Sequence, residues 1–248
     1  MKRAPRLARR QRLGIVSKGE LTMAKIPYAA AGSQRWLQIA VTKAPMLLDS
    51  ALRRSGAVDR RDSVEWRCPL ASDGFRECRD GEALRRLGIE TLPKMSLSEF
   101  WPRRGPVWDA LGVTAQGACI LVEAKAHIPE AVSPPSKASA ESLTLIRQSL
   151  DSARRFYAPR SKADWSVTFY QYANRLAFQY FLAQINGVKS RIVFLDFCNA
   201  SDMGGPESEA EWRGATRLIH AQLGLPADLT EFGVFHAYVN VQHLEDLV

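Results

Sequence analysis

The sequence of 248 residues has few cysteines and no long apolar run. Its four cysteines, Cys68, Cys78, Cys119 and Cys198, are widely spaced and form no CxxC pair, which argues against a zinc ribbon and a disulfide framework. No apolar stretch approaches the roughly 20 residues that span a bilayer. The sequence also lacks the pattern of a signal peptide, a charged start followed by an apolar block. We therefore expect a cytoplasmic protein without membrane contact.

Two common catalytic motifs are also missing. The sequence contains neither a GxxxxGK[ST] phosphate loop nor a GxSxG elbow, which disfavours P-loop NTPases and α/β-hydrolases. His220, His236 and His243 have no metal-ligand spacing with one another.

The net charge of +8 is concentrated at one end of the chain. Residues 1–22 contribute +6 of it and show no helical apolar stripe, so the rest of the chain is only slightly basic. We expect residues 1–32 to form a basic, disordered arm and residues 33–248 to form a single domain. Global charge is therefore weak evidence for nucleic-acid binding, and local basic clusters must carry that case.

Hydrophobic periodicity and turn residues predict a mixed α/β domain. Ser33 is a candidate N-cap for the first helix, and Pro45 is expected to start a second helix that ends near Arg54–Gly56. A helix from Asp164 to Asn186–Gly187 is also predicted. The other expected elements are strands at 64–70, 191–197 and 234–241, a β-hairpin over 105–125, and helices around 81–89, 143–156 and 207–224.

The hairpin contains the feature that points to chemistry. Its second strand, "ACILVEAK", begins as an apolar run but ends with Glu123 and Lys125, which share one face because side chains alternate along a strand. Residues whose numbers sum to 232 would pair in one register, which places Asp109 opposite Glu123 and pairs Val113 with Cys119. A register summing to 231 would place Asp109 on the other face. Two carboxylates beside an amine suit a metal site with a lysine that positions water.

Asp109, Glu123 and Lys125, on a hairpin between helices, resemble the PD-(D/E)xK nuclease superfamily. The resemblance implies a restriction-endonuclease-like αβββαβ core, with a mixed central sheet flanked by helices. It also implies that Asp109 and Glu123 bind Mg²⁺ or Mn²⁺ and that Lys125 orients the attacking water. The proline expected immediately before the aspartate stands three residues earlier, at Pro106.

Several flanking residues are candidates for the same site. The resemblance suggests Gln171 as the polar residue that completes the catalytic set from the following helix. Asn174 and Arg175 share its face at i+3 and i+4, and they are candidate substrate contacts. The other candidate substrate contacts are His127, Arg103 and Arg104. Glu77 and Glu99 could each supply a further carboxylate, although a solvated acid is the simpler interpretation.

Three functions remain open from the sequence. The first is Mg²⁺-dependent hydrolysis of nucleic acid, with DNA favoured over RNA and a homodimer possible. The second is a catalytically inactive protein of the same fold that binds nucleic acid or a protein partner. The third is an α/β enzyme that acts on another phosphorylated substrate, because the chain after residue 22 is only slightly basic.

Overall fold

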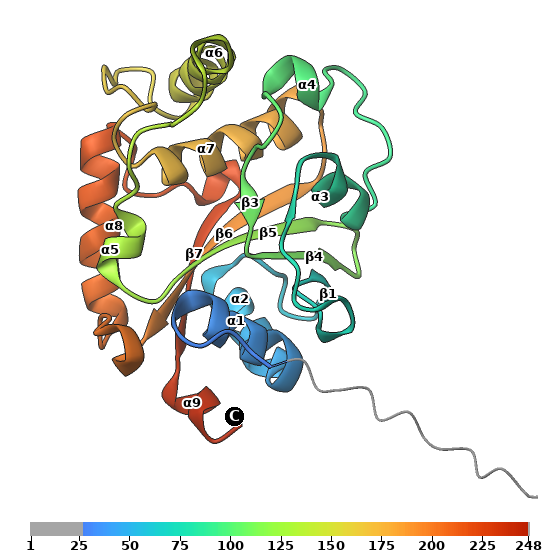
Figure 1. Ribbon diagram of the computed structural model, residues 1–248, viewed down its shortest axis with the longest axis vertical. Coiled ribbons are helices and arrows are strands. Elements are labelled where there is room, and N and C mark those ends of the chain that lie inside the picture. The colour runs from blue at the N-terminus through green and yellow to red at the C-terminus, as the bar shows by residue number, and fades with distance from the viewer. Residues whose placement is uncertain (1–26, 248) are drawn as a thin grey trace, which may run out of the picture.

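The computed structural model describes residues 27–247, whose centre is a five-stranded mixed sheet (Figure 1). The strand order is β1-β4-β5-β6-β7; β1, β4 and β5 are antiparallel neighbours, whereas β5, β6 and β7 run parallel. The strands of this sheet are β1 (Val64–Cys68), β4 (Ala110–Thr114), β5 (Cys119–Lys125), β6 (Ser190–Cys198) and β7 (Val234–Asn240). Two short strands, β2 (Cys78–Arg79) and β3 (Val107–Trp108), form a separate antiparallel pair. The predicted mixed α/β class is confirmed.

Helices cover both faces of the sheet (Figure 1). Apolar residues of α1, α2 and α9 pack on one face, and those of α6, α7 and α8 pack on the other. The helices are α1 (Gly32–Lys43), α2 (Pro45–Ser55), α3 (Asp80–Arg86), α4 (Leu97–Phe100), α5 (Ile128–Ala131), α6 (Ala140–Tyr157), α7 (Tyr170–Gln179), α8 (Glu209–Leu223) and α9 (Gln242–Glu245). Among residues 27–247, none of these helices combines the length and the apolar character that crossing a bilayer requires.

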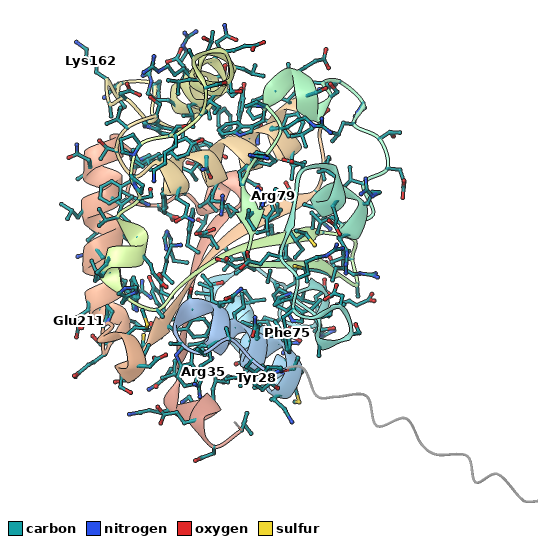
Figure 2. The ribbon with its side chains drawn as sticks, in the orientation of Figure 1. Tyr28, Arg35, Phe75, Arg79, Lys162 and Glu211 are labelled. Atoms are coloured by element: carbon teal, nitrogen blue, oxygen red, sulfur yellow. The ribbon has the colours of Figure 1, made fainter. Side chains whose placement is uncertain are left out.

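Parallel strands need crossover connections, and helices supply them here. The chain leaves β5, passes through α5, α6 and α7, and returns as β6; α8 then connects β6 to β7. Figure 2 shows side chains filling the space between the sheet and its helices on both sides. At the edge of the structure, Tyr28 lies beside Phe75, with ring centroids 5.4 Å apart (Figure 2).

Most of the predicted elements are present, including the helix that starts at Pro45 and ends at the left-handed Gly56. The predicted start of the long helix at Asp164 is wrong. Asp164 accepts hydrogen bonds from the amide and hydroxyl of Ser166 and closes a local turn. Phe169 then adopts a left-handed conformation, so α7 begins only at Tyr170, and it continues as a π-helix over Tyr180–Ile185.

The predicted N-cap at Ser33 is also wrong. The helix α1 begins one residue earlier, at Gly32, and Ala31 occupies the cap position without a side-chain hydrogen bond. The Ser33 hydroxyl instead donates to Glu130 Oε1, 3.4 Å away, which connects α1 to α5. The predicted arm over 1–32 falls mostly on residues 1–26, which lie outside the described part of the chain.

Candidate functional site

Of the two registers that the sequence left open, the β4–β5 hairpin has the one in which paired residue numbers sum to 232. Ala110 lies opposite Val122, and Val113 lies opposite Cys119. Asp109 directly precedes β4, where the predicted first strand is interrupted by a bend between β3 and β4. Its Oδ2 accepts a hydrogen bond of 2.7 Å from the amide of Ala124. The Asp109 carboxylate is thereby held against β5, next to Glu123.

Glu123 is buried and bound by two cations. Its Oε2 accepts from Arg175 Nε at 2.6 Å, and its Oε1 accepts from the Lys125 ammonium. The guanidinium of Arg175 also donates to the carbonyl of Val107, 2.6 Å away, and lies 4.7 Å from the ring centroid of Trp108. A buried carboxylate without such partners would cost several kcal/mol. The two cationic partners therefore explain how a carboxylate can be buried at the end of the otherwise apolar strand β5.

The two neighbouring carboxylates have opposite pKa shifts. Burial raises the pKa of Asp109 to about 7, and the negative charge of Glu123 adds to this shift. Burial also opposes ionisation of Glu123, but the charges and hydrogen bonds of Arg175 and Lys125 outweigh it and lower its pKa. Glu123 is therefore ionised at neutral pH, whereas Asp109 is only partly ionised. Neighbouring acids with pKa values pushed apart are frequent at functional sites.

Asp109 opens onto a surface pocket of about 590 Å³. Glu77 and Glu130 contribute further carboxylates to its lining, and Arg104 and Lys137 contribute cations. Burial and the nearby charge of Glu123 raise the pKa of Glu77, so its carboxylate shares the electrostatic environment of the site. Glu99 does not line this pocket. Its side chain instead completes a capping box with Ser96 at the start of α4.

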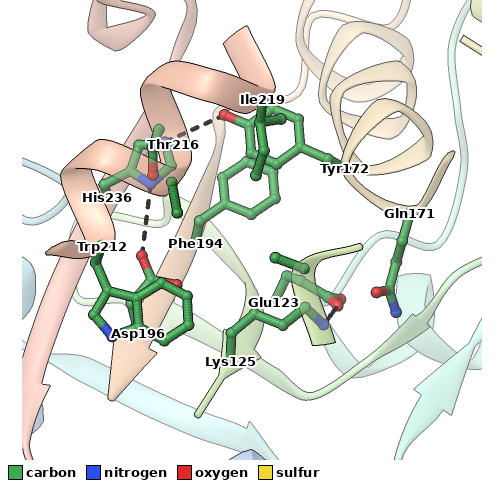
Figure 3. A pocket seen from close by; sticks show the side chains of 12 residues that line it. Glu123, Lys125, Gln171, Tyr172, Phe194, Asp196, Trp212, Thr216, Ile219 and His236 are labelled. Carbon is green, nitrogen blue, oxygen red and sulfur yellow. Dashed lines mark hydrogen bonds and ion pairs between the residues drawn. The ribbon is translucent and has the colours of Figure 1, made fainter. Parts of the chain in front are cut away.

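The helix α7 brings the predicted polar stripe to this pocket. Gln171, Asn174 and Arg175 all line it, as their common face predicts. Gln171 also lines the cavity that contains Glu123 and Lys125, and its side chain points toward them (Figure 3). Asn174 is buried and accepts from Arg175 Nη1 at 2.8 Å. All three nitrogens of the Arg175 guanidinium therefore have protein partners, a role that its prediction as a substrate contact did not include.

The remaining predicted contacts lie at the edge of the site. Arg103 and Arg104 are exposed, and of the two only Arg104 lines the 590 Å³ pocket. Arg104 has a positive φ of 66°, and its amide donates to Asp80 Oδ2. His127 follows β5 as predicted, but it precedes α5, where its Nδ1 lies 3.4 Å from Glu130 Oε2.

A second polar network lies beside Lys125 on the same face of the sheet. Asp196 is the β6 residue opposite Lys125, and it lines a cavity of about 30 Å³ together with Lys125, Tyr172 and His236 (Figure 3). This volume holds roughly one or two water molecules. Asp196 is buried, which raises its pKa, and its Oδ2 lies 3.9 Å from His236 Nδ1. The isolated aspartate in the apolar run "RIVFLDF" was the available sequence signal for this network.

The hydrogen bonds of this network have a defined direction. His220 Nδ1 lies 2.9 Å from the carbonyl of Pro226, which can only accept, so Nδ1 carries a proton. Burial lowers the pKa of His220 to about 4, and its neutral ring therefore accepts through Nε2. The Tyr172 hydroxyl donates to that nitrogen at 2.7 Å, and its oxygen accepts from His236 Nε2 at 3.2 Å. This leaves His236 Nδ1 facing Asp196.

Asp109 and Glu123 carry oxygen atoms of the kind that a hard divalent cation prefers. Among residues 27–247, no group of three or more His, Cys, Asp or Glu side chains is arranged as metal ligands. Mg²⁺ is commonly bound through only one or two carboxylates, with water and substrate phosphates supplying the other oxygens. Asp109 and Glu123 provide two carboxylates, and Asp109 lacks the paired cations that hold Glu123. A cation at this site would stabilise the ionised form of Asp109.

Comparisons with protein-family models, with curated proteins and with solved structures find no match for this chain. The fold defines a mixed α/β protein, and its function must be inferred from the chemistry of the site.

Proposed function

We propose that this protein is a metal-dependent nuclease of the PD-(D/E)xK type. One observation carries the proposal: a hydrogen bond from the amide of Ala124 holds the carboxylate of Asp109 against β5, the strand of Glu123 and Lys125, and Asp109 lines an open pocket. The order of elements supports it, since α1 and α2 precede β1, β4 and β5, and α7 precedes the parallel strand β6. This order is similar to the αβββαβ core of that superfamily.

Each residue has a chemical role in this proposal. Asp109 and Glu123 would hold Mg²⁺ or Mn²⁺ through carboxylate oxygens. Lys125 remains an ammonium, because the neighbouring carboxylates raise its pKa despite burial. It would hold the attacking water and offset negative charge that develops on the scissile phosphate. Gln171, which points toward the Glu123–Lys125 pair, would orient the same water (Figure 3).

A bound Mg²⁺ would supply positive charge to the scissile phosphate and favour ionisation of water. Arg175 contributes by keeping Glu123 ionised and fixing its orientation. Arg104 and Lys137, on the pocket wall, are available for phosphate contacts.

The test is incubation with labelled single- and double-stranded DNA and RNA, with Mg²⁺ or Mn²⁺ and with EDTA. We expect metal-dependent cleavage that falls at least about 100-fold in Lys125→Ala and Asp109→Ala, the scale of losing one electrostatic catalytic group. Lys162→Ala, which removes an exposed lysine away from the site, should cleave like the original protein. Cleavage that persists in Asp109→Ala and Lys125→Ala would exclude this site as its source.

The ion pair between Glu123 and Arg175 favours a second candidate function. Both Glu123 oxygens accept from cationic side chains, an arrangement that is complete without a metal. A protein of nuclease-like fold that binds nucleic acid or a protein partner without cleaving it would retain such a pair. In that case the cleavage assay should remain negative with every metal, while the stability of the protein should be unaffected by EDTA.

A further inference from the structure

A groove of about 430 Å³ lies between α8 and the edge strand β7, away from Asp109. One wall is the helix face that carries Arg213, Thr216, Arg217 and His220. The strand residues Val234, His236 and Tyr238 form the other wall, and the end of α2 and the loop 227–230 close the groove. Neither the proposed hydrolysis nor its candidate residues use this groove.

The composition of the α8 face distinguishes the groove from ordinary packing. Positions 213, 216, 217 and 220 have the i, i+3, i+4, i+7 spacing of a single helix face. A face with this spacing that packs on a sheet is normally apolar, yet this one is polar throughout. The apolar packing of α8 is provided by Trp212, Ile219 and Leu223, which are buried together with His220 of the groove face. Arg213, Thr216 and Arg217 therefore face the groove, whereas His220 also holds the helix through its hydrogen bonds with Tyr172 and Pro226. The guanidinium of Arg213 lies 5.0 Å from the ring centroid of Tyr238, across the groove.

The groove has an excess of positive charge. Of the residues that the structure describes, three arginines (Arg54, Arg213 and Arg217) and one carboxylate, that of Asp228, line it. Asp228 already accepts from the amide of Thr230 at 2.8 Å. Arg213 lies 3.5 Å from Glu209 in an exposed ion pair, which contributes little. Among residues 27–247, no carboxylate lies within ion-pair distance of Arg54 or Arg217.

We propose that this groove binds a phosphate group. Planar guanidinium groups match phosphate oxygens in geometry and charge, and they bind them in bidentate pairs. The hydroxyl group of Thr216 lines the same groove and can donate to a further oxygen. The phosphate can belong to a nucleic-acid backbone or to a free phosphorylated molecule such as a mononucleotide.

The groove lies next to a small cavity of the proposed catalytic site. Thr216 and His236 line both the groove and the small cavity that Glu123 and Lys125 also line (Figure 3). Phosphate binding here needs no metal and no cleavage, so it can be tested even if the protein is not a nuclease.

The experiment measures binding in EDTA, with anisotropy of a short fluorescein-labelled single-stranded DNA and calorimetry of inorganic phosphate and AMP. Arg213→Ala/Arg217→Ala should weaken binding at least about tenfold. For the DNA, the slope of log affinity against log salt should fall by about 1.4, two phosphate contacts at roughly 0.7 each. The matched control is Arg60→Ala/Arg61→Ala, which removes the same charge from an exposed turn outside the groove.

The outcomes separate the sources of the phosphate. Loss of DNA binding in the groove variant alone assigns the groove to a nucleic-acid backbone. Binding of AMP and phosphate but not of DNA, lost in the same variant, assigns it to a free phosphorylated molecule. Equal weakening in the groove and control variants, or no binding of any of the three probes to the unchanged protein, would overturn the proposal. If a separate assay with Mg²⁺ detects no cleavage, that result would contradict only the proposed nuclease function and not phosphate binding in the groove.

Discussion

The two faces of the central sheet differ sharply in what they bury. Toward α1 and α2, strands β5, β6 and β7 bury apolar side chains, namely Val122, Ala124, Val193, Leu195, Phe197, Phe235, Ala237 and Val239. The charged Arg191, near the start of β6, lies at the edge of this face and donates to the carbonyl of Ala57. Toward α7 and α8, the same three strands present Glu123, Lys125, Asp196, His236 and Tyr238, with Phe194 among them. A buried polar group costs free energy unless it is paired, so the second face depends on specific partners whereas the first depends mainly on packing.

The largest expected effect comes from removing Arg175 on the polar face. Arg175→Met leaves Glu123 buried with Lys125 as its only cationic partner, and we expect a loss of about 3–5 kcal/mol in the free energy of unfolding. Urea unfolding at neutral pH measures it. Adding Glu123→Gln should recover part of this loss, because the uncompensated charge is then removed. A loss below about 1 kcal/mol would mean that the pair contributes no more than a surface ion pair.

Leu195→Ala is the matched change on the apolar face. Leu195 is fully buried, so the cavity should cost about 2–5 kcal/mol. A second substitution at Glu123 should not recover this loss, which is the contrast with Arg175→Met.

The next effect is a dependence of stability on pH at His220. Its pKa is lowered to about 4 in the folded protein from an ordinary value of 6.5, so the unfolded chain binds the proton more readily. The contribution is complete above pH 6.5 and is lost as the pH falls from 6.5 to 4, by up to about 3 kcal/mol. Unfolding of the original protein and of His220→Gln should be compared across this range. Parallel stability curves for the two proteins would contradict a neutral, buried His220.

The smallest effect is expected at Tyr172. Tyr172→Phe removes the hydroxyl that bridges His220 and His236 but keeps the ring stacked on Phe194, at a centroid distance of 4.0 Å. The loss should be about 1–3 kcal/mol, the cost of leaving buried polar groups unpaired. Thermal unfolding measures it, with Tyr170→Phe on the same helix as the control. No loss at Tyr172 would mean that water replaces the hydroxyl in the network.

The sequence predicted what depends on local periodicity and failed where distant segments meet. Alternation along β5 placed Glu123 and Lys125 on one face, but it left two hairpin registers open, and only the structure shows that Val113 pairs with Cys119. The pairing of Glu123 with Arg175 joins residues 52 positions apart, and nothing near either residue indicates it. The start of α7 was misplaced because Asp164 has the composition of a helix cap, but its oxygens are used by Ser166. An aspartate that closes a short turn can thus be mistaken in the sequence for the N-cap of a helix.

The same limit applies to the network of Asp196, Tyr172, His220 and His236. Each residue lies in an element that was predicted correctly or nearly so, but the network depends on the parallel order β5-β6-β7. Only this order brings Asp196 beside Lys125 and His236 beside Phe194. Strand order is set by packing of the whole sheet, which no short stretch of sequence encodes.

The position of Arg175 over Trp108 has an optical consequence. The guanidinium that holds Glu123 also covers the Trp108 indole, which is itself buried in the core. A ligand that draws the Glu123 carboxylate away from Arg175 would change the charge next to that ring. The emission of Trp108, one of six tryptophans in the chain, would then shift without any added dye. The protein thus contains its own fluorescent reporter of events at Glu123, which Trp108→Phe would silence.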